Sequence, residues 1–229
     1  MNETRDLNIS PRNQEQRDQK GIQKFSLHQI KQHFDETVKS IEEQFKIADG
    51  FVNNKLDGKE YIWRSQIVFL VAALDFYMHE LTKYGLCEIF GGNWEKTNKY
   101  KNIKIEMETV HKILEAGDKI SCFREYVDKR YQKITMMSFD SINEQFKLLG
   151  IDATVISNSA FSKTEPIGDK NELKTRLDSL YRRRNLIAHQ NDRSHADATI
   201  QDIFEDEVRQ FIDDTIKIID SIDSAVHKK

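Results

Sequence analysis

Apolar residues recur at spacings of three and four over most of the chain, as in an amphipathic α-helix with one buried face. Between about residues 25 and 56 the recurring positions are Phe34, Val38, Ile41, Phe45, Ala48 and Val52. The Asp57-Gly58 pair predicts the end of that helix. The following run, Ile67–Leu74, is apolar on every side. Such a helix is buried by neighbours all round, so a second helix at about residues 59–84 is expected at the centre of the core.

Further helices are predicted at about residues 103–115, 117–134, 138–149, 169–189 and 199–226. Ser138 is a plausible N-cap for the third of these, and Gly150 is its stop signal. Residues 85–102 are expected to form a loop with a short helical turn near Trp94. Residues 151–168 are rich in Ser, Thr, Asn and Asp, which predicts an irregular stretch with at most a short extended piece at Thr154–Ile156.

These patterns predict an all-α fold, a bundle of four to six helices with a long N-terminal helix. Residues 1–22 contain almost no apolar side chains and are interpreted as a disordered or frayed tail. Residues 23–229 are expected to form a single helical domain.

Composition narrows the classes of function. The net charge is −3, whereas a protein that binds long nucleic acid non-specifically is usually basic, so any nucleic-acid contact is expected to be local, through a patch. The apolar runs are too short to span a bilayer, and the polar N-terminus has no signal segment. Two lone cysteines, Cys87 and Cys122, suit a reducing cytoplasm. We therefore expect a cytoplasmic protein with no membrane partner, no metal and no cofactor.

Candidate chemistry is concentrated in residues 181–192, which read Tyr-Arg-Arg-Arg-Asn-Leu-Ile-Ala-His-Gln-Asn-Asp. An arginine can clamp a phosphate with a fixed fork of donors. A histidine can carry a proton near neutral pH. A phosphate clamp beside a proton carrier is the minimum needed to cut a phosphodiester without a metal.

Helical geometry assigns different environments to the three arginines. At about 100° per residue, with Leu177 as zero, Arg184 falls at about −20°, in the middle of the apolar stripe. A guanidinium placed there needs a partner, and Asp75 at the end of the apolar run is the expected one. Arg183, at about 240°, is expected in solvent.

The remaining motif residues are expected to share a neighbouring face. Asn185 falls at about 80°, His189 at about 120° and Arg182 at about 140°. A structural role stays open at this stage, because a basic run near a helix C-terminus also complements the helix dipole. The nuclease interpretation is preferred because the Asn185–His189 face has no evident structural need.

The motif resembles the signature of the HEPN superfamily, an arginine followed a few residues later by a histidine, often with an asparagine directly after the arginine. Arg184, Asn185 and His189 match it. The Ala-Ala-Leu-Asp-Phe segment at residues 72–76 looks like the helix that packs against the motif helix in that superfamily. Residues 123–151 are similar to the subgroup associated with RiboL-PSP proteins, so the resemblance extends over roughly residues 60–225.

The resemblance implies a helical bundle that dimerises so that two motifs face each other, and metal-independent cleavage of RNA by attack of a ribose 2′-hydroxyl. His189 would act as general base or acid, Arg184 would stabilise the charge of the phosphorane, and Asn185 would orient the histidine or the phosphate. Arg182 would add a phosphate contact, and Asp75 would hold Arg184.

The resemblance also implies partners: an RNA substrate, a second copy of the chain, and an antitoxin or another protein of a defence system. HEPN toxins paired with nucleotidyltransferase antitoxins carry a tyrosine two residues after the histidine, whereas position 191 here is asparagine. Silencing by modification of that tyrosine is therefore not supported. The alternative is a non-catalytic helical interaction module in a hetero-complex.

Overall fold

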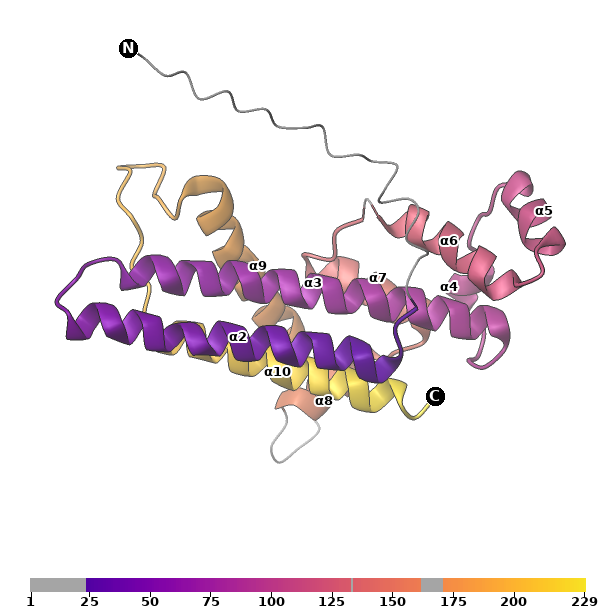
Figure 1. Ribbon diagram of the computed structural model, residues 1–229, viewed down its shortest axis with the longest axis horizontal. Coiled ribbons are helices and arrows are strands. Elements are labelled where there is room, and N and C mark those ends of the chain that lie inside the picture. The colour runs from indigo at the N-terminus through magenta and orange to yellow at the C-terminus, as the bar shows by residue number, and fades with distance from the viewer. Residues whose placement is uncertain (1–23, 133, 162–170) are drawn as a thin grey trace, which may run out of the picture.

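The computed structural model describes residues 24–132, 134–161 and 171–229, which form an α-helical bundle (Figure 1). These ranges contain no strand, only an isolated bridge between Arg193 and Ile200. The all-α prediction is therefore confirmed. The predicted tail, residues 1–22, lies outside the described residues.

Two long helices, α2 (Leu27–Asn53) and α3 (Lys59–Gly91), run side by side through the bundle (Figure 1). Ser26 and Gln29 form a capping box that starts α2. The face of α2 that meets the core consists of Ile30, Phe34, Val38, Ile41, Phe45 and Ala48. This is the predicted stripe, except that Val52 is exposed near the end of the helix.

α3 is the central helix, because α2, α6, α7, α9 and α10 all contact it. Ile67, Leu70 and Leu74 are completely buried, as predicted. Burial is not complete on every side, since Phe69 is 51% and Phe76 is 43% exposed. The helix also passes the predicted end at residue 84 and continues to Gly91. Gly85 lies inside the helix, where its missing side chain leaves room for Trp94 and Leu149 to pack closely against α3.

Five shorter helices follow: α4 (Asn98–Lys101), α5 (Met107–Glu115), α6 (Lys119–Tyr131), α7 (Phe139–Leu149) and α8 (Ala153–Phe161). Ser138 caps α7 and Gly150 ends it in a left-handed conformation, both as predicted. The irregular stretch predicted from residue 151 is wrong over α8, where Thr154–Ile156 is helical. Contacts with α9 and α10 account for the difference, because α8 packs on both helices with Ile156 buried, although its Ser, Thr, Asn and β-branched residues are weak helix formers.

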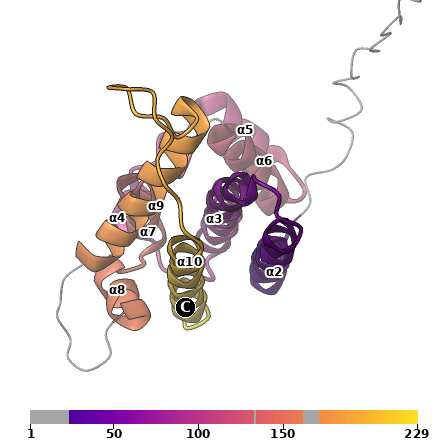
Figure 2. The same ribbon diagram turned by 90° about the vertical axis from the view of Figure 1, so that its left-hand side faces the viewer.

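The chain ends with α9 (Asn171–Gln190) and α10 (Glu205–Val226). α10 begins later than the predicted residue 199 because residues 191–204 form a folded loop rather than a helical turn. Figure 2, which looks along the bundle, shows α10 between α9 and α2, with the end of α9 rising above α3. None of the helices in the described ranges is both long enough and apolar enough to cross a bilayer.

Candidate functional site

The first half of α9 is buried and the second half emerges from the bundle. Leu173, Leu177, Leu180 and Tyr181 are buried, whereas Ile187 is only half-buried and Ala188 is exposed. Figures 1 and 2 both show the end of α9 projecting beyond α3. The predicted apolar stripe therefore has a core to face only over its first turns, and the motif lies where that core ends.

Arg183, expected in solvent, is the buried arginine of the motif, with 7% of its surface exposed. Its Nη1 atom lies 2.5 Å from the Oδ1 atom of Asp192. Its Nη2 atom donates a hydrogen bond of 2.7 Å to the backbone carbonyl of Asp202. The Glu207 carboxylate lies 3.5 Å from Nε. The prediction for this residue was wrong because the folded loop after α9 covers a face that would otherwise point to water.

Asp192 is fully buried and binds a second arginine from the central helix. Its Oδ2 atom lies 2.8 Å from Nε of Arg64, and Nη2 of Arg64 donates to the backbone carbonyl of Gln201 at 2.6 Å. We call Arg64, Arg183 and Asp192 the Asp192 node. Buried charges persist in proteins when they are paired and hydrogen-bonded. The node therefore ties α3, the end of α9 and the following loop into one unit.

The backbone places Asp192 directly after the helix. Asn191 and Asp192 both adopt left-handed conformations, with φ of 49° and 56°. The amide of Asp192 donates to the carbonyl of Leu186 at 2.9 Å, which closes the last turn of α9. Sequence reasoning missed this residue. The available signal was Arg64, a charged side chain that shortly precedes the apolar run of the core helix and requires a buried carboxylate.

Arg184 is half-buried and does not pair with Asp75. The prediction of an inward Arg184 held by the Asp75 carboxylate was therefore wrong. Its Nη1 atom donates to the side-chain oxygen of Asn185 at 3.1 Å. Asp75 instead accepts from the backbone amide of Met136 at 2.7 Å and lies 3.7 Å from Nε2 of His79. Arg184 sits past the buried part of α9, so the interior environment that would demand a carboxylate is absent.

Tyr181 binds the same backbone residue as Asp75, Met136. Its hydroxyl donates to the carbonyl of Met136 at 3.0 Å, and burial together with the nearby Asp75 charge raises the pKa of the Tyr181 phenol far above its ordinary value. Tyr181 is therefore a neutral donor. The two side chains fix residue 136 from both its amide and its carbonyl, which is a structural role.

Arg182, Asn185 and His189, which helical angles place on one face, are all exposed. The His189 side chain is exposed, and within the described ranges its ring has no hydrogen bond or ion pair. The Nε atom of Arg184 is buried without a hydrogen-bond partner among the same residues. The end of α9 thus exposes the Asn185 amide and the His189 imidazole one turn apart. Their catalytic roles stay predictions.

Neither of two surface cavities in the described part of the chain includes these residues. One, of about 440 Å³, lies beside the Asp192 node between the start of α3 and residues 200–204. The other, of about 620 Å³, lies between α4, α6 and α7. Arg184, Asn185 and His189 line neither cavity.

A helical bundle with a polar motif near the end of its penultimate long helix is the arrangement expected of a HEPN domain. The chain belongs to the RiboL-PSP-HEPN family, whose family model matches residues 35–228. This confirms the resemblance and extends it into α2. Comparisons with curated proteins and with solved structures find no match.

Proposed function

We propose that this protein is a metal-independent endoribonuclease that cleaves RNA from the end of α9. The observation that carries the proposal is the exposed face of Arg182, Asn185 and His189, with Arg184 hydrogen-bonded to Asn185. The Asp192 node holds this face in place. A solvent-facing array of phosphate donors beside an imidazole is what phosphodiester cleavage requires.

In the proposed reaction the ribose 2′-oxygen forms a bond to the adjacent phosphorus and the bond from phosphorus to the 5′-oxygen breaks. The products are a 2′,3′-cyclic phosphate and a 5′-hydroxyl. His189 removes the proton of the 2′-hydroxyl or delivers one to the leaving 5′-oxygen. Arg184 stabilises the additional negative charge of the phosphorane. Asn185, held by Arg184, orients the phosphate or the imidazole.

A second copy of the chain completes the site in this proposal. The motif of a single chain lies outside both cavities described above, and one imidazole cannot be base and acid in the same step. Phe69, Ala72 and Phe76 form an exposed apolar stripe on α3, which suits a contact between copies. The composite cleft then holds two motifs. An antitoxin or another defence protein would control the enzyme by covering this cleft.

The test is cleavage of mixed cellular RNA in EDTA by the wild type and by His189→Ala, followed by analysis of the RNA ends. We expect cyclic phosphate and 5′-hydroxyl ends from the wild type. The variant is expected to cleave at a rate at least about a hundredfold lower. His195→Ala is the matched control, because His195 is an exposed histidine of the adjacent loop, and it should cut normally. Full cleavage by His189→Ala would contradict the proposal.

A second candidate is a non-catalytic interaction module. It is favoured by one observation, that Arg183 of the basic run is a structural residue of the Asp192 node. In that case no preparation cleaves RNA, with or without EDTA, while the chain still assembles through its exposed apolar stripe. The RNA assay above separates the two candidates.

A further inference from the structure

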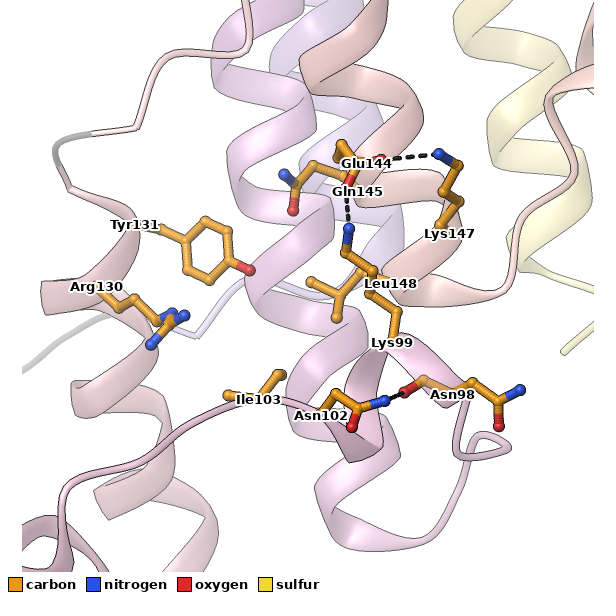
Figure 3. A pocket seen from close by; sticks show the side chains of 10 residues that line it. All are labelled: Asn98, Lys99, Asn102, Ile103, Arg130, Tyr131, Glu144, Gln145, Lys147 and Leu148. Carbon is orange, nitrogen blue, oxygen red and sulfur yellow. Dashed lines mark hydrogen bonds and ion pairs between the residues drawn. The ribbon is translucent and has the colours of Figure 1, made fainter.

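The cavity of about 620 Å³ between α4, α6 and α7 is a basic cleft. Figure 3 shows Arg130 and Tyr131 on one side, Lys147 and Glu144 on the other, and residues of α4 below. Three cationic side chains and one carboxylate line it, which leaves a net charge of +2. The lining cations are Lys99, Arg130 and Lys147. In a chain with a net charge of −3, this is a local concentration of positive charge.

The cations of this cleft are only partly compensated. Lys99 and Lys147 both pair with the single carboxylate of Glu144. Among the described residues Arg130 donates only to neutral groups, the Tyr126 hydroxyl at 2.9 Å and the carbonyl of Lys104 at 3.2 Å. Lys101 and Lys104 are exposed and continue the basic run beyond the lining. An anion entering the cleft would therefore meet cations that lack a full set of counter-charges.

Gln145 adds a specific polar group to the floor of the cleft. The residue is only 8% exposed, and its Oε1 atom is buried with no hydrogen-bond partner in the part of the chain that the structure describes. Figure 3 shows its amide pointing toward the ring of Tyr131. A buried acceptor without a donor is costly, and a ligand that supplies an N–H or O–H removes that cost. The cleft is therefore complementary to a ligand with both an anionic group and a hydrogen-bond donor.

We propose that this cleft binds a nucleotide, with its phosphate on Lys99, Lys147 and Arg130 and a base or ribose donor on Oε1 of Gln145. The nucleotide belongs either to an RNA strand or to a free nucleoside phosphate. The first source rests on the proposed function, because the strand would also reach the motif on α9. Arg64, beside that motif, and Gly85, beside α7, are separated by about 30 Å of α3, so the two sites are distinct.

The experiment measures binding rather than cleavage, in the full chain carrying His189→Ala. The probes are a fluorescent single-stranded RNA oligonucleotide and ATP. In Lys99→Gln/Lys147→Gln we expect RNA affinity about tenfold lower, and a plot of log affinity against log salt that is shallower by about 1.4. The matched control is Lys39→Gln/Lys46→Gln on the exposed face of α2, which removes the same charge and should change nothing.

A second variant tests the acceptor without changing charge. Gln145→Leu keeps the volume of the side chain and should lower affinity roughly two- to tenfold with no change in salt dependence. Lower affinity for ATP with unchanged affinity for RNA would identify a free nucleotide as the ligand. Unchanged affinity for both probes in both cleft variants would overturn the proposal.

The outcome is independent of the proposed nuclease activity. If the wild type fails to cut RNA but the cleft variants lose affinity, the nucleotide site stands and the nuclease proposal fails. If the wild type cuts RNA and the cleft variants bind both probes normally, only the nucleotide site fails.

Discussion

Asp192 is the residue on which the end of α9 depends. Its carboxylate is completely buried between Arg64 and Arg183, so its removal leaves two buried guanidinium groups without their charge partner. We expect Asp192→Ala to lower the free energy of unfolding by about 3–5 kcal/mol. Urea denaturation measures the loss. Asp213→Ala, which removes an exposed carboxylate from α10, is the control and should change stability by less than about 0.5 kcal/mol.

The adjacent arginines of the motif should respond in opposite ways. Arg184→Ala is expected to abolish RNA cleavage while stability changes by no more than about 1 kcal/mol, because Arg184 is half-buried and, within the described ranges, hydrogen-bonded only to Asn185. Arg183→Ala is expected to destabilise the fold by about 3–5 kcal/mol, because it breaks the buried node. Thermal melts and RNA gels on both variants check this. A large loss of stability in Arg184→Ala would mean that its role is structural.

At the scale of elements, α3 depends on a glycine in its interior. A Cβ atom added at Gly85 would lie 2.6 Å from the Trp94 ring and 2.7 Å from a methyl group of Leu149. Glycine therefore lets the 93–94 turn and α7 approach the central helix closely. This close packing offsets the low helix propensity of glycine.

We expect Gly85→Ala to destabilise the protein by about 1–3 kcal/mol, since the overlap outweighs the gain in helix propensity. Gly91→Ala on the last turn of the same helix meets only ordinary contacts, the nearest at 3.5 Å, and serves as the control. Equal stability of the two variants in denaturant would show that the close approach at Gly85 is not required.

At the scale of the whole molecule, the exposed stripe on α3 is where assembly can be tested. Phe69→Glu/Phe76→Glu should convert the proposed dimer to monomers in analytical ultracentrifugation and abolish RNA cleavage, because charge opposes burial at an interface. Val52→Glu/Leu56→Glu introduces the same charge at the exposed end of the α2–α3 pair and should leave the oligomeric state and the RNA cleavage unchanged. A dimer that survives the first pair of substitutions would place the contact elsewhere.

Periodicity and capping signals were sufficient for most of the fold. The stripe of α2, the Ser138 cap and the Gly150 stop are local features, and each was readable because it depends on residues within one or two turns. α8 was missed because its Ser, Thr, Asn and β-branched residues are weak helix formers, whereas the helix packs on α9 and α10.

The sequence alone established an all-α bundle, and helical angles placed Arg182, Asn185 and His189 on one face; their exposure comes from the tertiary structure. Only the tertiary structure decided which arginine is buried. Helical angles placed Arg184 inward, but the core ends before that turn, and the loop after α9 folds back to bury Arg183 instead. The partner of that arginine also binds Arg64, which is 128 residues from Asp192. Such a contact depends on how distant segments pack, and no local pattern contains it.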